Sequence, residues 1–498
     1  MEDSLADAPD APLEPTPGSS SRERASGHFF LGGLFSALFL GLSLPPSNHR
    51  LMPWFALTPF LYSLYRNRDS LGARLFHGIC FGATLSSWFL APIFRSVLNE
   101  SLDESTASAI LNTVAEAGLP WLVLTSCWAL FAVLSGWVLR SGCPWTALAA
   151  LPFTWTGIEY VRLECLPYTF PHLVLGSTLD PESPEAQGAA LLGVYGLGLA
   201  IVFVNTSFTM ALVQTRWKLQ AALATLASVV VVALATLGPS TALESGRRAP
   251  IRMGIVQVAR GNSHTAPLEI AQTLLPSSPA IIVFPERVFS DSTSDTVAQE
   301  ALAAFAKTEE VSLLCGQGTE TSEVLLIDSS GSKGGSTTAG SRLWFGDSKR
   351  MEGDPALIDA TGATRIGAGV DADFLHPGSA RRLTASGAEI LVCVASDPSR
   401  WGRLFALLHD RMCALRAVEN GRWLVRATQG GVSSVTSPDG RSILRSPAGL
   451  DWGAAENIGR QEGLTFYTRF GWWIGPLSLI GLAVVFVQAV RARRARRG

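Results

Sequence analysis

Long hydrophobic runs separated by short polar segments dominate the pattern of this 498-residue chain. A helix needs about 20 mainly apolar residues to cross a bilayer. Eight runs are candidate membrane spans: 28–45, 51–65, 75–97, 108–139, 144–162, 188–213, 217–238 and 467–491. The pattern predicts a multi-pass α-helical membrane bundle of about eight spans, with seven of them in residues 28–240 and the eighth at 467–491.

Two stretches modify this pattern. The fourth run is longer than one span requires and contains Pro120, so we expect a re-entrant or interfacial turn within it. Residues 1–27 are polar and rich in Pro, Ser and Asp, without a basic segment ahead of a short apolar run. This composition predicts a disordered cytoplasmic tail and not a cleaved signal peptide.

Residues 249–462 show a different pattern, in which short apolar strands alternate with helical stretches. The predicted strands are 251–258, 280–284, 311–318, 323–328, 388–396, 422–428 and 431–437, and the clearest helices are 292–308 and 403–420. Continuous apolar strands that alternate with helices predict an α/β domain whose sheets are covered on both sides. We therefore expect one large water-soluble domain between the seventh and the eighth span.

Positive charges indicate the orientation of the chain, because cytoplasmic loops of membrane proteins carry an excess of Lys and Arg. If the N-terminus is cytoplasmic, every basic cluster falls on that side: Arg66, Arg68, Arg74, Arg140, Arg216, Lys218 and the tail 492–498. Both termini are then cytoplasmic, and the domain 249–462 lies in the periplasm of a Gram-negative cell. We expect a protein of the bacterial inner (cytoplasmic) membrane.

Composition and motifs exclude several functional classes. The chain is 47% hydrophobic and 16% charged with a net charge of −2, so no basic surface for nucleic acid stands out. Its seven cysteines lack CxxC spacing and neighbouring histidines, which argues against a zinc site or a disulfide framework. Because neither a P-loop nor a GxGxxG motif after a strand is present, we expect no nucleotide, cofactor or metal. We further expect a monomer.

The first candidate for chemistry is Glu286, which follows the predicted strand 280–284 in the sequence AIIVFPER. A carboxylate at the end of an apolar strand is partly desolvated, which raises its proton affinity and suits it to act as a general base. Strand ends are also the places where α/β proteins form their sites. The alternative is an ordinary solvated turn glutamate, and these residues alone leave both interpretations open.

Longer motifs connect the chain to a known family. The segments IIVFPE (281–286), GAEILVCVASDPSRWG (387–402) and ALRAVENGRWLVRATQGGVSSVTSPDGR (414–441) resemble the carbon-nitrogen hydrolase (nitrilase) domain. The segments ALPFTWTGIEYVR (150–162), PHLVLGSTL (171–179) and LLGVYGLGLAIVFVN (191–205) resemble the apolipoprotein N-acyltransferase family. The resemblance implies an αββα sandwich for residues 249–462, placed between the last two of eight membrane spans.

The resemblance also implies a two-step acyl transfer without a cofactor. A cysteine thiolate takes a fatty acyl chain from a phospholipid, and the thioester then acylates the N-terminal cysteine of a diacylated lipoprotein. A glutamate serves as base and a lysine stabilises the oxyanion. Here Glu286 stands at the glutamate position, whereas Ala339 stands at the lysine position and Asp371 at the nucleophile position. Asp347 occupies the position of a second acid.

These replacements oppose the chemistry of the family. Asp371 beside Glu286 would bring two carboxylates together, so the pKa of one of them should rise. Attack by an aspartate on an ester would form a mixed anhydride, which is far less favourable than a thioester. Cys393, on the predicted strand 388–396, is the candidate for a displaced nucleophile if Glu286 activates it. The alternative is an inert buried cysteine, as we expect for Cys413.

Two functional hypotheses therefore stay open. The resemblance predicts an N-acyltransferase, with or without a displaced nucleophile. The replacements at Ala339 and Asp371 favour a catalytically silent paralogue that binds lipid or lipoprotein without acyl transfer, because a covalent mechanism loses many orders of magnitude without its nucleophile. The Gly- and Ser-rich stretch 331–341 is predicted to be flexible, and His172 is predicted to be an interface histidine rather than a metal ligand.

Overall fold

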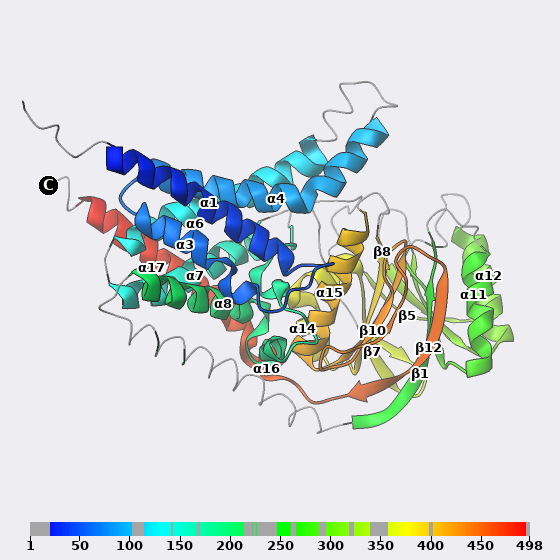
Figure 1. Ribbon diagram of the computed structural model, residues 1–498. Coiled ribbons are helices and arrows are strands. Elements are labelled where there is room, and N and C mark those ends of the chain that lie inside the picture. Colours follow the sequence, from blue (N-terminus) through cyan, green and yellow to red (C-terminus); the bar gives the residue numbers. More distant parts are fainter. Residues whose placement is uncertain are drawn as a thin grey trace, which may run out of the picture.

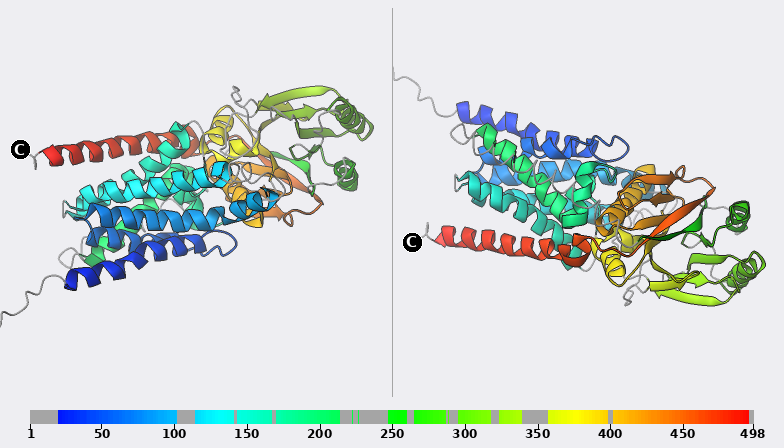
Figure 2. Two further views of the ribbon diagram at one scale, coloured as in Figure 1. Left: turned by 90° about the horizontal axis from the view of Figure 1, so that it is seen from above. Right: turned by 90° about the horizontal axis from the view of Figure 1, so that it is seen from below.

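The computed structural model contains a helical bundle and an α/β domain that lie end to end (Figure 1). It describes residues 20–101, 114–140, 143–166, 170–213, 247–259, 265–286, 295–317, 323–338, 357–397 and 402–494, together with residues 222, 226 and 288. Figure 2 shows that the C-terminal helix α17 (Ile474–Arg494) lies alongside the bundle. Because α17 follows the α/β domain in the sequence, the chain returns to the bundle at its C-terminal end.

Apolar helices form the bundle. They are α1 (Ser20–Leu42), α2 (Pro53–Ala56), α3 (Thr58–Arg66), α4 (Leu71–Ser101), α6 (Leu119–Leu139), α7 (Pro144–Tyr160), α8 (Ala189–Val213) and α17. Among the described residues, three segments are long and apolar enough to cross a membrane: Leu71–Ser96, Leu119–Leu139 and Pro184–Val213. These segments support a membrane bundle, whereas the predicted total of about eight spans is not confirmed. The predicted span 217–238 lies outside the described residues, apart from residues 222 and 226.

Local sequence explains how α6 begins and how it packs. A short π-helical turn, Val114–Gly118, precedes α6, and Pro120 lies in the first helical turn, where its missing N–H breaks no hydrogen bond. Glycines on α4 then allow close contact with α6, since a Cβ at Gly78 would lie 2.7 Å from the Cβ of Ala132. Gly118 has helical backbone angles, so the π-helical turn continues directly into α6, and a re-entrant or interfacial turn in the overlong fourth run stays a prediction.

Two six-stranded sheets make up the centre of the α/β domain. The first has the order β12-β1-β2-β3-β4-β5, with β1 (Arg247–Gln257), β2 (Ile281–Val283), β3 (Ser312–Gln317), β4 (Glu323–Ile327), β5 (Lys333–Thr338) and β12 (Trp452–Gln461). The second has the order β11-β10-β9-β8-β7-β6, with β6 (Leu357–Ala360), β7 (Thr364–Val370), β8 (Ile390–Ser396), β9 (Trp423–Gln429), β10 (Ser434–Thr436) and β11 (Ser442–Arg445). The central strands of each sheet, β1 to β3 and β7 to β9, run parallel.

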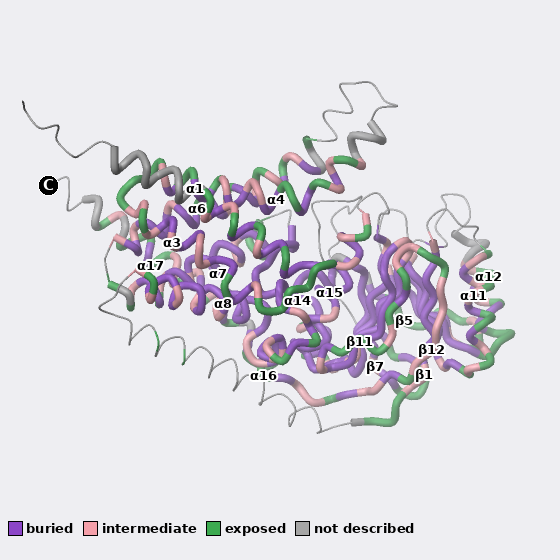
Figure 3. Tube along the Cα trace, in the orientation of Figure 1, coloured by how far each residue is buried: buried purple, intermediate pink, exposed green. Residues whose placement is uncertain are grey.

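The central strands are mainly apolar because both of their faces are buried. In β2, Ile281 and Val283 belong to the cluster between the two sheets, whereas Ile282 belongs to the cluster under the outer helices. Successive side chains of a strand point to opposite faces of the sheet, so a strand in the middle of a layered domain needs apolar residues at every position. Figure 3 shows this burial across both sheets.

Helices cover the outer face of each sheet. Helices α11 (Ala266–Leu274) and α12 (Asp295–Thr308) cover the first sheet on the side far from the bundle (Figure 1). Helices α13 (Asp371–Leu375), α14 (Pro377–Ala385) and α15 (Gly402–Asn420) cover the second sheet, and α14 and α15 lie between it and the bundle. The predicted αββα sandwich is therefore confirmed.

One local prediction was wrong. Residues 333–338, within the stretch predicted to be flexible, form the edge strand β5, which pairs antiparallel with β4. The free hydrogen-bonding groups of β4 provide a template that outweighs the weak strand propensity of Gly and Ser. Strands β6, β7, β11 and β12 were also not predicted. They contain many polar or small residues, so a search for apolar runs misses them.

Candidate functional site

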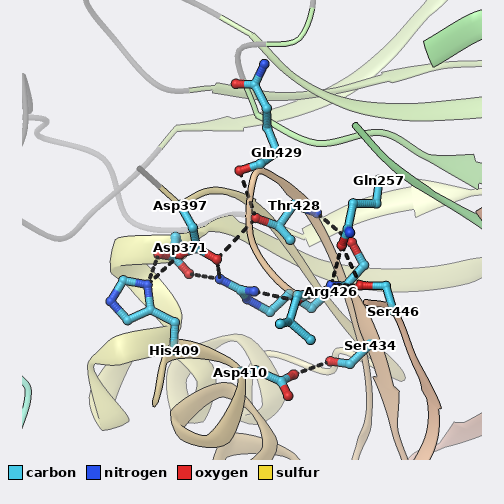
Figure 4. Close-up of polar contacts among 12 residues, drawn as sticks. Gln257, Asp371, Asp397, His409, Asp410, Arg426, Thr428, Gln429, Ser434 and Ser446 are labelled. Carbon is cyan, nitrogen blue, oxygen red and sulfur yellow. Dashed lines mark hydrogen bonds and ion pairs between the residues drawn. The ribbon is translucent and has the colours of Figure 1, made fainter. Parts of the chain in front are cut away.

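Parallel strands of the second sheet bring charged side chains together (Figure 4). Asp371 follows β7 directly, Asp397 follows β8, and Arg426 lies within β9, paired with Cys393. Because these strands run parallel, their carboxyl ends meet at one edge of the sheet. His409 reaches the same place from α15. We refer to Asp371, Asp397, His409 and Arg426 as the charge cluster.

Short polar contacts connect all members of the charge cluster. The Nδ1 atom of His409 lies 2.7 Å from Asp397 Oδ1 and 2.9 Å from Asp371 Oδ2. The Nη2 atom of Arg426 donates to Asp371 Oδ1 at 3.1 Å and to Asp397 Oδ2 at 2.9 Å. All four residues are buried, with at most 7% of their surface exposed. The four side chains therefore form a closed, water-excluded network.

Opposite charges balance within the charge cluster. Burial alone would lower the pKa of His409, but Asp371 and Asp397 raise it to about 10. Burial alone would raise the pKa of Asp371, but His409 and Arg426 hold it well below its usual range. Asp371 does lie beside a second carboxylate, Asp397, but the pKa of Asp371 is lowered and not raised, because His409 and Arg426 contact both carboxylates. Two carboxylates, an imidazolium and a guanidinium add up to a neutral group, which avoids an unpaired buried charge.

The same residues offer ligand atoms for a metal ion. Atoms of Asp371, Asp397 and His409 lie within 4.8 Å of one another, as do atoms of Asp371, Cys393 and Cys413. The contacts of 2.7 and 2.9 Å from His409 Nδ1 fit hydrogen bonds that this nitrogen donates. Since Arg426 already neutralises the carboxylates from the other side, a divalent cation would add excess positive charge. The arrangement fits protons better than a metal.

The position of Asp371 makes it a poor nucleophile. Both of its carboxylate oxygens contact cationic groups, Oδ1 with Arg426 and Oδ2 with His409. A carboxylate in such contacts is less basic and less nucleophilic than a free one. The residue at the nucleophile position is therefore an ion-paired carboxylate on the buried side of the site.

Cysteines provide no exposed thiol in the α/β domain. Residues 249–462 contain three of them, Cys315, Cys393 and Cys413, and all three are buried. Burial and a hydrogen bond with Cys413 raise the pKa of Cys393 well above its ordinary value, and burial raises the pKa of Cys315 to about 12. A thiol that stays protonated and buried lacks the electropositive, accessible setting of reactive cysteines.

The direction of Cys393 also separates it from Glu286. In β8, Cys393 belongs to the cluster under α14 and α15, whereas its neighbour Val394 belongs to the cluster between the sheets. Val394 is the residue near Glu286, since a Cβ at Gly316 would lie 2.8 Å from Glu286 Cα and 3.0 Å from Val394 Cγ2. Cys393 therefore points to the opposite face of the sheet from Glu286.

Glu286 lies where the two sheets meet. It is 7% exposed, which does not fit a solvated turn residue, and its backbone N–H donates to the carbonyl of Ala395 at the end of β8, at 3.3 Å. This bond places the end of the first sheet next to the strand that precedes Asp397. Ala339 and Asp347 lie outside the described residues.

Sequence reasoning missed three members of the charge cluster. Asp397 follows an apolar strand just as Glu286 does, so the same signal could have identified it. Arg426 is the one charged residue of the mainly apolar strand β9, which indicates a buried ionic partner. His409 lies on a long helix of mixed polarity, and no local pattern distinguishes it from surface residues.

Helix α15 also attaches the α/β domain to the bundle. Arg411 donates to four acceptors in two loops of the bundle: the carbonyls of Ser43, Thr178 and Leu179 and the side-chain oxygen of Asn48, at 2.8–3.2 Å. Eight residues further along α15, Glu419 Oε1 accepts a hydrogen bond from the backbone N–H of Val194 at 2.7 Å. The helix that carries His409 is therefore fixed to the helical bundle.

Comparisons with known proteins agree with this layout. Residues 36–207 match the apolipoprotein N-acyltransferase N-terminal domain, and residues 304–458 match the carbon-nitrogen hydrolase domain. An apolipoprotein N-acyltransferase from Thermosynechococcus vestitus is 27% identical over 407 residues, which cover 72% of this chain and 76% of that protein. One from Gloeobacter violaceus is 36% identical over 133 residues, 27% of this chain and 25% of that protein. One from Pseudomonas paraeruginosa is 32% identical over 155 residues, 31% of this chain and 29% of that protein.

The alignments with the last two relatives therefore span only about a quarter to three tenths of their length. Among solved structures, an amidase from Nesterenkonia sp. AN1 is 18% identical with a TM-score of 0.35, over 42% of this chain and 93% of that one. The match of residues 304–458, which lie in the two sheets covered by helices, assigns the α/β domain to the carbon-nitrogen hydrolase class. With the bundle domain before it, the chain belongs to the apolipoprotein N-acyltransferase family.

Proposed function

We propose that the protein transfers a fatty acyl chain from a membrane phospholipid to the N-terminal cysteine of a diacylated lipoprotein. The observation that carries this proposal is the match of both halves of the chain, in order, to the two domains of the family. The contacts of α15 with the bundle support it, because they hold the ends of β7 and β8 near the membrane. Both substrates are lipid-anchored and would meet there.

The proposal includes a location. The bundle would lie in the inner membrane of a bacterium, with residues 249–462 in the periplasm, both termini in the cytoplasm and a single copy as the working unit. The Lys and Arg residues of the short loops support this orientation, because they fall on one side when the N-terminus is cytoplasmic. The three long apolar helices support a membrane setting.

We further propose that the acyl chain passes directly between the substrates, without an enzyme-bound thioester. The amine of the lipoprotein cysteine would attack the ester carbonyl, so that a C–N bond forms as the C–O bond to the lysophospholipid breaks. Glu286 would take the amine proton and return it to the departing alkoxide. The ion pairs of Asp371 and the burial of Cys393 support this route, because neither side chain is available as an acyl carrier.

A second candidate function is binding without catalysis. The specific observation in its favour is that Asp371, at the nucleophile position, is part of a neutral, buried cluster. Loss of a covalent nucleophile removes most of the rate enhancement of such enzymes. In this case the chain would hold lipid or lipoprotein at the membrane and would not acylate it.

Complementation distinguishes the two candidates. The chain is expressed in a bacterial strain whose own apolipoprotein N-acyltransferase can be depleted, and the N-termini of lipoproteins are analysed by mass spectrometry. Acyl transfer predicts growth and N-acylated lipoproteins with the wild type, loss of both with Glu286→Gln, and no loss with the control Glu309→Gln, an exposed residue that directly follows α12.

Absence of N-acylated lipoprotein with a stably produced wild type would contradict the first candidate. Co-purification of diacylated lipoprotein with that protein would then support the second. A double variant, Asp371→Cys with Ala339→Lys, restores the residue types of the family. If only this variant acylates, the silent-paralogue hypothesis gains direct support.

A further inference from the structure

A loop of the bundle brings a second histidine to the charge cluster. His172 lies between α7 and α8 and is 2% exposed. Residues of α7 and of its π-helical extension, Val161–Cys165, bind this loop. Arg162 Nη1 donates to the carbonyl of His172 at 3.0 Å, and Glu159 Oε1 accepts from the backbone N–H of Leu175 at 2.9 Å. The position of His172 is therefore set by polar groups of the bundle.

The two histidines contact each other directly across the junction of the two domains. The Nε2 atoms of His172 and His409 lie 2.8 Å apart, and both rings are buried. Aromatic rings surround His172, with centroid distances of 5.4 Å to Phe89, 4.6 Å to Phe170 and 4.6 Å to Phe405. Water therefore has little access to this hydrogen bond.

Hydrogen positions in this pair follow from counting protons. A contact of 2.8 Å between two ring nitrogens requires one shared hydrogen. His409 Nδ1 faces two carboxylates and must carry a hydrogen of its own. If His172 donated the shared hydrogen, His409 would be neutral and the charge cluster would carry a net negative charge. If His409 donates it, the imidazole of His409 is a cation and the cluster is neutral.

The surroundings favour the second arrangement. Burial lowers the pKa of His172 well below its ordinary value, and the nearby positive charge of His409 adds to this effect. Burial also lowers the pKa of His376 to about 4, so His376 adds no positive charge at neutral pH. Titratable and charged groups face the histidine pair from several elements, namely Asp371 and His376 from the α13–α14 segment, Asp397 after β8, Arg426 in β9 and Arg162 after α7.

We propose that His172 is a positioning residue that accepts a hydrogen bond from His409 and thereby holds His409 as the doubly protonated partner of Asp371 and Asp397. The membrane bundle then sets the orientation and charge of the cluster at the nucleophile position. This inference goes beyond the proposed function, since it applies whether or not acyl transfer occurs. It also gives His172 a specific role in place of the interface role that its sequence position suggested.

Nitrogen-15 NMR of the histidine rings tests the proposal on the full chain in lipid nanodiscs. The His409 signal is assigned as the one that disappears in His409→Gln. In the wild type we expect both ring nitrogens of His409 to carry hydrogen at pH 8. His172→Leu removes the acceptor, so the protonation midpoint of His409 should fall by about one pH unit or more. His172→Gln places a side-chain carbonyl at a similar distance from His409, so the protonation midpoint of His409 should stay close to that of the wild type.

A matched control is His49→Gln, because His49 is an exposed histidine of the bundle loops and its replacement should leave the His409 signal unchanged. A neutral His409 in the wild type at pH 8 would overturn the proposal, and so would an unchanged midpoint in His172→Leu. If the leucine variant does not fold, the wild-type spectrum and the glutamine variant still decide the question. None of these readouts depends on acyl transfer, so failure here is distinct from failure of the proposed function.

Discussion

The two sheets of the α/β domain differ in the chemistry of their outer faces. Apolar side chains such as Leu274, Leu302 and Phe305 attach α11 and α12 to the first sheet. On the second sheet, α15 carries polar side chains as well, and His409 and Arg411 connect the charge cluster and the bundle. Figure 1 shows that the apolar cover faces away from the bundle and that α15 faces toward it.

This difference indicates two tasks within one fold. Apolar contacts are non-directional and contribute stability in proportion to buried area. Hydrogen bonds and ion pairs depend on geometry, so they fix the orientation of the domain relative to the helical bundle. The residues of the charge cluster lie on the second sheet and on α15, where these directional contacts are made. We infer that the first sheet mainly stabilises the domain, whereas the second orients it.

Removal of the central cation should have the largest effect. Arg426→Met leaves Asp371 and Asp397 without their guanidinium, and breaking a buried ion pair in this way costs about 3–5 kcal/mol. We expect a large drop in the thermal midpoint of the purified protein. Arg441→Met is the matched control, because the Arg441 side chain is 71% exposed and its loss should change stability by at most about 0.5 kcal/mol. Equal effects of both variants would contradict the importance of the cluster.

The attachment to the bundle should give the next largest effect. Arg411→Gln removes most of the hydrogen bonds that reach the loops of the bundle, which should cost about 2–3 kcal/mol. Thermal unfolding in nanodiscs measures the loss. Arg403→Gln, an exposed arginine on the same helix, serves as the control. If both variants unfold alike, α15 does not attach the domains in the way that the contacts suggest.

Stability should also depend on pH in a defined direction. The pKa of His409 is about 10 in the folded chain against an ordinary value of 6.5, so its contribution is complete below pH 6.5 and is lost as the pH rises toward about 10. In this pH window the free energy of unfolding should fall by up to about 1.4 kcal/mol for each pH unit. Asp371 has a lowered pKa, so its contribution is lost as the pH falls below 3.8. Chemical denaturation at several pH values measures the loss of stability at high pH and the loss at low pH. Stability that rises between pH 7 and 9 would contradict a protonated, ion-paired His409.

The smallest effect is expected at Cys393. Cys393→Ala removes a buried sulfur from the cluster under α14 and α15, at a cost of about 1 kcal/mol. Formation of any N-acylated lipoprotein should be unchanged, because the thiol is buried and points away from Glu286. Loss of the product in a variant that remains folded would identify Cys393 as the displaced nucleophile and would reverse our proposal.

Much of the fold could be predicted from the sequence, because apolar runs report burial on both faces of a strand. The runs at 280–284 and 388–396 became β2 and β8, and the helical pattern at 403–420 became α15. Strand β5 could not be predicted, since its Gly and Ser residues form a strand only because β4 offers a free edge.

The candidate site was less predictable for a physical reason. Asp371 could be located by register within the family motif, and Glu286 by its place after a strand. The contacts of His409 with His172 join residues 237 positions apart, and no local pattern encodes such a pairing. The carboxylate beside Asp371 is Asp397, within 4.8 Å, and cations from α15 and β9 contact both of them, an arrangement that only the tertiary structure brings together.

The most direct test of this account is whether an acyl chain is ever attached to the protein. Full-length protein in vesicles is incubated with a phospholipid that carries an isotope-labelled acyl chain, without any lipoprotein acceptor, and the intact mass of the protein is measured before and after hydroxylamine. The account predicts no acyl adduct on residues 249–462 of the wild type, since Asp371 is ion-paired and the three cysteines of the α/β domain are buried. An acyl adduct that hydroxylamine removes, mapped to Asp371 or to Cys393, would contradict it.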